Sequence, residues 1–256
     1  MYLTVKQLRM EPTRGDDARP ALLSIVVPCF NEAATLERLL SLVLQSPVAL
    51  AKEIVVVDDG STDQSPEIIE RFVGRRPPDV RVVTARHQVN QGKGAALQTA
   101  LAHATGDVIV IQDADLEYDP GDYPVLLAPI LVGAAHVVYG TRRTQRSLSD
   151  STFSQWRFII AAWTVTQIAN LLFRARLTDY ATGYKVFTRR LADQLKLRAT
   201  GFEVDAEITA RVRKLGYDIV EVPIRYRPRS VAEGKKIRGI DGWRALMTLF
   251  KEFRST

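Results

Sequence analysis

The chain has 256 residues, 46% hydrophobic and 25% charged, and this balance excludes an intrinsically disordered protein. Its single cysteine, Cys29, excludes a disulfide within one chain, and with only three scattered histidines any bound metal should be a hard cation on oxygen ligands. The net charge of +6 is uneven, since residues 1–137 carry 12 Lys and Arg against 18 Asp and Glu (net −6) and residues 138–256 carry 23 against 11 (net +12). The basic half predicts an anionic partner, with a solvated basic face as the alternative.

Residues 1–21 are polar and lack a signal-peptide pattern, so we expect a flexible leader before one domain over residues 22–256. Four β-branched runs follow, alternating with segments of helical periodicity. This alternation predicts an α/β fold with a parallel sheet, in which ligands bind beyond the carboxyl ends of the strands. The expected strands are Leu22–Pro28, Glu53–Asp58, Val80–Ala85 and Asp107–Gln112, and the expected helices are Glu32–Leu44, Gln64–Gly74 and Gly92–Thr105.

Acidic residues stand where three of these strands end. Single carboxylates such as Glu32 and Asp58 have helix capping as an equal alternative role. Asp113, Asp115 and Glu117 alternate at i, i+2 and i+4, which in extended backbone points all three side chains the same way. Three anions on one face repel each other unless a cation joins them, so we predict a divalent ion here.

Gly92-Lys93-Gly94 is not a P-loop, because His87 stands where the first glycine is needed and Gly94 where Ser or Thr is needed. Glycines at the start of a helix still allow backbone donors to approach a nucleotide. No Gly-x-Gly-x-x-Gly follows the first strand, which argues against a dinucleotide cofactor.

Seven motifs together resemble the family 2 glycosyltransferases of GT-A fold, and within them the dolichol-phosphate mannose synthase-like polyprenyl-phosphate glycosyltransferases. The resemblance covers Leu22 to Lys251. It implies a Rossmann-like, mixed but mostly parallel sheet flanked by helices, with a nucleotide-sugar-binding half over 22–137 and an acceptor-binding half over 138–256. The motifs are Pro28-Cys29-Phe30-Asn31-Glu32, Val57-Asp58-Asp59-Gly60-Ser61, Asn90-Gln91-Gly92-Lys93-Gly94, Asp113-Ala114-Asp115, Gly140-Thr141-Arg142, Leu177-Thr178-Asp179 with Gly183-Tyr184-Lys185, and Glu221-Val222-Pro223-Ile224.

The resemblance also implies roles for individual residues. One departure concerns the acceptor site, since Ala161 stands where relatives often carry a serine near the acceptor phosphate. A group of four, Asp113, Asp115, Arg142 and Arg229, is expected to act in catalysis. The nucleoside should be held by Pro28, Phe30, Glu32 and Asp58, a Mg²⁺ or Mn²⁺ ion by Asp113, Asp115 and Glu117, phosphates of donor or acceptor by Arg142, Arg157, Arg229 and Lys235, and substrate also by Lys93 and Asp179.

We therefore expect an inverting, in-line transfer of a hexose from a nucleoside-diphosphate sugar, of the GDP-mannose or UDP-glucose type, to a polyprenyl phosphate. A phosphate acceptor is already anionic and needs positioning rather than a general base. If the acceptor is a soluble or polymeric hydroxyl instead, Asp179 is the candidate base, and a turn residue is its equal alternative role. A non-catalytic sugar-nucleotide or membrane-binding module is a further alternative. Nucleic acid ranks last, because the basic residues form no recognisable module.

Two segments concern access to a membrane. Phe158–Phe173 is apolar but too short and polar to span a bilayer, and Trp156 and Trp163 with flanking arginines favour an interfacial helix. A buried core or dimer helix is the equal alternative. Gly239–Phe253 is amphipathic, and we expect it to pack on the sheet rather than to lie on the surface. Together these features predict a peripheral enzyme on the cytoplasmic face of the membrane.

Overall fold

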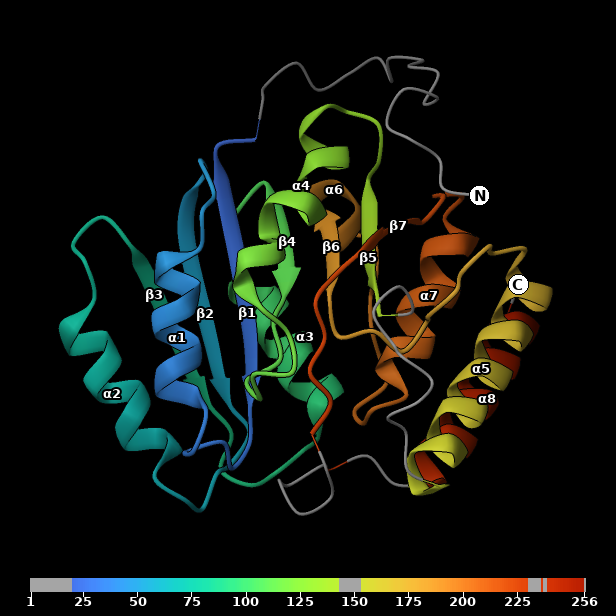
Figure 1. The fold of residues 1–256 in the computed structure, drawn as a ribbon, viewed down its shortest axis with the longest axis horizontal. Coiled ribbons are helices and arrows are strands. Elements are labelled where there is room, and N and C mark those ends of the chain that lie inside the picture. Colours follow the sequence, from blue (N-terminus) through green and yellow to red (C-terminus); the bar gives the residue numbers. More distant parts are fainter. Residues whose placement is uncertain (1–19, 143–152, 230–235, 237–238, 256) are drawn as a thin grey trace.

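The structure is a computed structural model that describes residues 20–142, 153–229, 236 and 239–255. At its centre lies a sheet in the order β3-β2-β1-β4-β6-β5-β7 (Figure 1). Within the described residues, β6 is antiparallel to both β4 and β5 and the other neighbours pair in parallel, so the expected mixed, mostly parallel sheet is confirmed. The strands are β1 Leu22–Cys29, β2 Ala51–Asp58, β3 Arg81–Arg86, β4 Val108–Ile111, β5 Val137–Thr141, β6 Lys185–Thr188 and β7 Val220–Pro223.

Helices cover both faces of this sheet (Figure 1). One apolar core lies beneath α1, α2 and α4, and a second lies beneath α3, α5, α6, α7 and α8. The helices are α1 Leu36–Gln45, α2 Ser65–Arg75, α3 Lys93–His103, α4 Tyr123–Leu131, α5 Phe153–Phe173, α6 Arg189–Ala192, α7 Val204–Lys214 and α8 Gly239–Arg254, with a short 3₁₀ helix at Pro120–Asp122.

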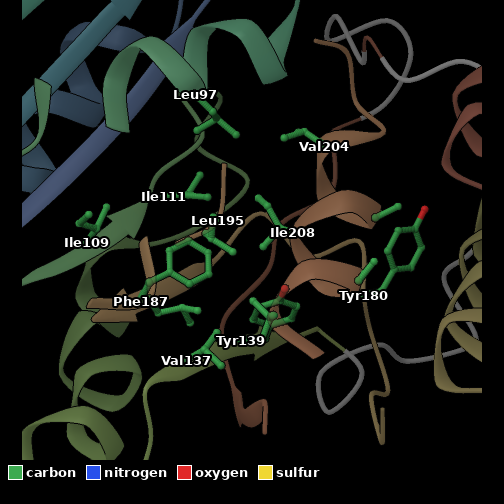
Figure 2. Packing of buried hydrophobic residues seen from close by; sticks show 14 of the residues in the cluster. Leu97, Ile109, Ile111, Val137, Tyr139, Tyr180, Phe187, Leu195, Val204 and Ile208 are labelled. Carbon is green, nitrogen blue, oxygen red and sulfur yellow. The ribbon is translucent and has the colours of Figure 1, made fainter. Parts of the chain in front are cut away.

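The central strands are apolar throughout because both of their faces are buried. In β1, Ile25 packs into the core beneath α1, whereas its neighbour Val26 packs into the core beneath α3. Figure 2 shows the second core, to which Ile109 and Phe187 of the sheet and Leu97 and Ile208 of the helices all contribute. The four strands expected from the sequence therefore form, with ends that differ by one or two residues.

The expectation that Gly239–Phe253 packs on the sheet is wrong. α8 packs against α7 and α5. The reason is that α7 already covers this part of the sheet, where the Tyr139 hydroxyl of β5 lies 3.2 Å from the Thr209 hydroxyl of α7. In the part of the chain that the structure describes, no helix has both the length and the apolar character that crossing a membrane requires.

Glu53 of β2 is a buried carboxylate that holds the sheet to the turn before β4. It accepts hydrogen bonds from the Ser24 hydroxyl and from the Thr105 backbone N–H at 2.7 Å, and Arg81 lies 2.5 Å away. Burial alone would raise the pKa of Glu53, but these hydrogen bonds and Arg81 outweigh it and the pKa is lowered.

Replacing Glu53 with Gln should therefore lower the free energy of unfolding at pH 7 by about 1–3 kcal/mol. A carboxylate whose folded pKa is depressed stabilises the fold above its unfolded pKa, near 4.5, and loses this effect as the pH falls through the folded value. Urea denaturation at pH 7 and below pH 4 measures this, with exposed Glu70→Gln as the control. Equal losses at both pH values would contradict the prediction.

Candidate active site

The carboxyl ends of β1, β2 and β4 meet at one edge of the sheet, as expected for parallel strands. The β1–β2 register places Cys29 opposite Asp58, and the Asp59 N–H donates to the Cys29 carbonyl at 2.7 Å. Glu32 follows β1 in a turn that contains Asn31 at φ 49°, and α1 begins only at Leu36. Glu32 therefore lies outside the helix that we expected it to begin.

The carboxylates after β4 do not lie in extended backbone, so the expected alternation is wrong. β4 ends at Ile111, and the chain then turns, with Leu116 at φ 59° and the Glu117 N–H donating to Asp115 Oδ1 at 3.1 Å. The turn still brings Asp113, Asp115 and Glu117 to the same edge of the sheet. It does so by local backbone geometry rather than by the two-residue period of a strand.

Each carboxylate at this edge is paired within the protein. Asp113 lies 2.8 Å from the Lys93 ammonium, and Asp115 lies 3.0 Å from the Arg229 guanidinium. Arg229 also forms two 3.0 Å hydrogen bonds with Glu32. Glu117 accepts hydrogen bonds from the Arg229 backbone N–H at 2.8 Å and from a tyrosine hydroxyl. Both halves of the chain thus supply positive charge to the acidic edge, and Arg229 comes from the basic second half.

The chemistry of these groups fits a hard divalent cation. Burial raises the pKa of Asp115 to about 7, and the neighbouring Asp113 and Glu117 charges add to the rise, which Arg229 only partly offsets. A site with surplus negative charge and oxygen ligands favours Mg²⁺ or Mn²⁺. Within the described residues, no three carboxylate, histidine or cysteine side chains converge on one point as they stand. Ion binding by Asp113, Asp115 and Glu117 therefore remains a prediction. It requires the side chains of Lys93 and Arg229 to move away from Asp113 and Asp115.

The residues expected at the nucleoside lie on the same edge. The Lys236 ammonium lies 5.7 Å from the centre of the Phe30 ring and 2.6 Å from Glu32. Asp58 is buried and accepts a hydrogen bond from the Ser61 N–H at 3.0 Å. Its Oδ2 lies 3.0 Å from Arg86 but accepts no well-aligned hydrogen bond. This buried acceptor could accept a hydrogen bond from an N–H group of a nucleobase. Pro28, within β1, is half-buried at the same edge.

Arg142 and Asp179 form a largely buried ion pair. Arg142 Nε donates to Asp179 at 2.6 Å and its terminal nitrogen donates at 2.7 Å. Burial would raise the pKa of Asp179, but Arg142 outweighs it and the pKa is lowered. A carboxylate held ionised in this way is a weak base, so the geometry argues against Asp179 as a general base. Arg142 also contacts Tyr118, whose hydroxyl accepts a 2.7 Å hydrogen bond from the Gly183 N–H.

The glycines around Lys93 have a packing role, and the approach of a nucleotide to them stays a prediction. A Cβ at Gly94 would lie 2.1 Å from the Ala199 carbonyl oxygen, and one at Gly92 would lie 2.5 Å from the Thr200 oxygen. The Ala95 N–H at the start of α3 donates to that same Thr200 oxygen at 3.1 Å. One N–H of the first turn of the helix is therefore already paired with backbone.

Gly183 is needed beside Asp113, because a Cβ there would lie 2.2 Å from Asp113 Oδ2 and 2.7 Å from the Tyr118 ring. We expect Gly183→Ala to displace Asp113 and to weaken Mn²⁺ binding by about tenfold or more. Isothermal titration with Mn²⁺ measures this. Gly74→Ala in α2, where a Cβ meets nothing within 4 Å, is the control, and equal affinities in both variants would contradict the prediction.

Two predicted site residues cannot be placed: Lys235 and the side chain of Arg157 lie outside the described part of the chain. The structure adds residues that the sequence reasoning missed. Lys236 is one of them, whereas the family resemblance implies a phosphate contact for its neighbour Lys235. Asp59 is another, since its carboxylate accepts hydrogen bonds from the Gln91 and Gly92 N–H groups at 3.0 and 2.8 Å and so holds the loop before Lys93. Its place next to Asp58 was the available signal.

The chain is similar to a known family of proteins and to several of its characterised members. Residues 24–196 match the model of a family described as "Glycosyl transferase family 2". Over 195 residues the chain is 30% identical to a dodecaprenyl-phosphate galacturonate synthase of Rhizobium johnstonii, covering 75% of this chain and 55% of that protein. It is 28% identical over 229 residues to an undecaprenyl-phosphate 4-deoxy-4-formamido-L-arabinose transferase of Salmonella choleraesuis, covering 86% and 64%.

A third relative is glycosyltransferase AglD of Haloferax volcanii, 25% identical over 242 residues that cover 90% of this chain and 38% of that protein. The chain thus spans between 38% and 64% of the length of these three relatives. Among solved structures, glucosyl-3-phosphoglycerate synthase of Mycobacterium tuberculosis with Mn²⁺, UDP and glucosyl-3-phosphoglycerate has a TM-score of 0.64 at 25% identity, covering 91% of this chain and 80% of that one.

Proposed function

Because the chain belongs to glycosyl transferase family 2, we propose that it is an inverting, metal-dependent hexosyltransferase. Its donor is a nucleoside-diphosphate sugar of the GDP-mannose or UDP-glucose type, and its acceptor is a polyprenyl phosphate. The observation that carries this proposal is the turn after β4, where Asp113, Asp115 and Glu117 meet Lys93 and Arg229 at the carboxyl edge of the sheet.

On the donor side, the buried Asp58 carboxylate accepts a hydrogen bond from an N–H of the nucleobase, and the Phe30 ring and Glu32 lie beside the nucleoside. Asp113, Asp115 and Glu117 would hold the ion, which would supply Lewis-acid stabilisation of the negative charge on the departing diphosphate. The synthase of M. tuberculosis crystallised with UDP and either Mg²⁺ or Mn²⁺, which supports this assignment.

On the acceptor side, an anionic phosphate oxygen attacks the anomeric carbon in line as the bond to the diphosphate breaks. Such an acceptor needs no general base, and Asp179 is unsuited to that role because Arg142 holds it ionised. Arg229 reaches the site from the second half of the chain and is the described cation best placed to meet the phosphate, with Arg157 and Lys235 as further proposed contacts. Two of the relatives, a dodecaprenyl-phosphate galacturonate synthase and an undecaprenyl-phosphate 4-deoxy-4-formamido-L-arabinose transferase, carry a polyprenyl phosphate in their names, which supports a lipid phosphate acceptor.

A lipid acceptor requires contact with a membrane. Helices α5 and α8 lie side by side (Figure 1), and both expose large apolar side chains. Trp243 is 63% exposed and Leu171 is 80% exposed. α8 starts three residues after Lys236, which touches Glu32, so the start of this helix is close to the site along the chain. Basic side chains flank the exposed apolar side chains, which suits an anionic leaflet on the cytoplasmic face. This apolar surface consists of Ile160, Trp163 and Leu171 of α5, and Ile240, Trp243, Met247, Phe250 and Phe253 of α8, with exposed Arg174, Arg176, Arg244, Lys251 and Arg254 around them.

A second candidate is transfer to a soluble hydroxyl acceptor, favoured by the likeness to glucosyl-3-phosphoglycerate synthase. The exposed apolar surface favours the lipid acceptor. The deciding experiment offers UDP- and GDP-sugars with Mn²⁺ to the chain, together with polyprenyl phosphate, its alcohol or phosphoglycerate. We expect glycolipid only from the phosphate. A product from the alcohol or from phosphoglycerate would favour the second candidate, and donor consumption with no acceptor preference would contradict both.

We expect the chain to sediment with vesicles that contain anionic lipid. A Trp243→Gln/Phe250→Gln variant should bind these vesicles at least about tenfold more weakly, because two large side chains no longer enter the interface. The control is Leu131→Gln/Val132→Gln at the end of α4, where two apolar side chains are also exposed. Equal binding of both variants would contradict the proposed surface.

A further inference from the structure

Behind the carboxylate edge lies a buried row of alternating charges. The Lys93 ammonium lies 2.8 Å from Asp113 and 3.9 Å from Asp205. Asp205, in the first turn of α7, lies 2.6 Å from the ammonium of Lys185 in β6. The row therefore runs from Asp113 through Lys93 and Asp205 to Lys185, and it connects the turn after β4 with α3, α7 and β6.

Lys185 is the far end of this row and is fully buried, with 0% of its side chain exposed. Its ammonium donates to the Thr182 carbonyl at 2.5 Å and lies 5.0 Å from the centre of the Tyr139 ring, which Figure 2 shows beside α7. A fully buried ammonium carries a large desolvation cost, and an apolar side chain at this position of the sheet would avoid it. The fold alone therefore does not account for Lys185.

We propose that Asp205 and Lys185 are positioning residues that hold the Lys93 ammonium at the donor site. This inference rests on the proposed function. Lys93 now pairs mainly with Asp113, one of the carboxylates expected to bind the ion. When Asp113 turns to the ion, Asp205 remains as the second partner, so the ammonium stays charged and in place beside the donor diphosphate.

Lys185 completes the arrangement by balancing Asp205. Burial would raise the pKa of Asp205, but Lys185 and Lys93 outweigh it and the pKa is lowered. Without Lys185, a buried carboxylate would draw Lys93 away from the edge of the sheet to serve as its only partner. With Lys185 in place, Asp205 orients Lys93 without binding it exclusively, as the longer 3.9 Å separation indicates.

The test is a double-mutant cycle between Lys93→Met and Asp205→Asn, read as the dissociation constants of UDP and GDP with Mn²⁺ by titration calorimetry. We expect each single variant to weaken binding of the preferred nucleotide about tenfold, because a charged contact is lost or misplaced. Since Asp205 acts through Lys93, the double variant should bind no more weakly than Lys93→Met alone. A hundredfold loss, the product of the single effects, would overturn the inference.

An Asp205→Asn/Lys185→Met variant separates positioning from stability, because it removes both buried charges together. It should unfold at nearly the wild-type temperature and still bind nucleotide about tenfold more weakly. Glu252→Gln is the matched control, since Glu252 also pairs with two cations of α7, Arg211 at 3.2 Å and Lys214 at 3.5 Å, away from the site. Wild-type nucleotide binding in the Asp205→Asn/Lys185→Met variant would assign the pair a structural role only. If the wild-type chain itself binds neither UDP nor GDP, the proposed function is wrong, and the inference that rests on it is wrong with it.

Discussion

An Asp115→Asn variant should transfer sugar about a hundredfold to a thousandfold more slowly than the wild-type chain and should bind Mn²⁺ much more weakly. Asp115 is the central member of the acidic turn, and its two carboxylate neighbours leave it with surplus negative charge. An amide of the same shape removes a negatively charged ligand. It can still accept the Glu117 N–H that Asp115 Oδ1 accepts now, so the turn should persist.

This variant should not unfold more easily than the wild type, because it relieves repulsion among three carboxylates. The control is Asp119→Asn, a nearby acidic residue that pairs with Arg225 at 2.8 Å and accepts the Gly121 N–H at 2.8 Å. Rates, Mn²⁺ titration and thermal unfolding measured together distinguish a lost ligand from a damaged fold. Wild-type Mn²⁺ affinity in Asp115→Asn would place the ion elsewhere.

Much of the sheet could be predicted from the sequence, because unbroken runs such as the one within Leu22–Cys29 are buried on both faces. The position of β6 could not be predicted in this way. Lys185–Thr188 lies between β4 and β5 and runs against both, and this order depends on tertiary pairing rather than on local pattern. The resemblance to GT-A enzymes supplied the mixed sheet that periodicity alone did not.

The site could be predicted in location but not in detail. Glu32, Asp58 and Asp115 do gather at one edge, since parallel strands bring their carboxyl ends together. The partners of these carboxylates were not predictable, because Arg229 is separated from Glu32 by 197 positions. The family resemblance placed Arg229 and Asp115 in the same site, and the contrast between an acidic first half and a basic second half was a further signal, but neither specified this pairing.

The sequence also did not predict that Lys185 is a buried charge next to the site, for a related reason. Sequence reasoning treats a lysine as solvated, since lysine is rarely buried unless it is paired. Its partner Asp205 lies 20 positions away, beyond the periodicity of one helix or strand. Only the meeting of β6 with the start of α7 reveals that this lysine belongs to the same charge row as Asp113.

An Arg229→Gln variant should bind Mn²⁺ several-fold more tightly in the absence of nucleotide, although its transfer rate should fall by about a hundredfold. In the structure the Arg229 guanidinium bridges Glu32 and Asp115, at 3.0 Å from each. It therefore neutralises the carboxylates with which an ion would interact, and an ion must displace it. Glutamine removes this competing charge, so the attraction of the site for a dication increases.

The two effects should have opposite signs if, as proposed, Arg229 competes with the ion in the resting protein and meets a phosphate in the reaction. Manganese paramagnetic resonance without nucleotide measures the first effect, and initial rates at saturating donor measure the second. Arg227→Gln is the control, since Arg227 is exposed two residues away and its backbone N–H keeps the 2.9 Å bond to the Glu117 carbonyl. Unchanged Mn²⁺ affinity in Arg229→Gln would mean that Asp115 does not bind the ion. Increased Mn²⁺ affinity with an unchanged transfer rate would mean that Arg229 does not bind a substrate phosphate.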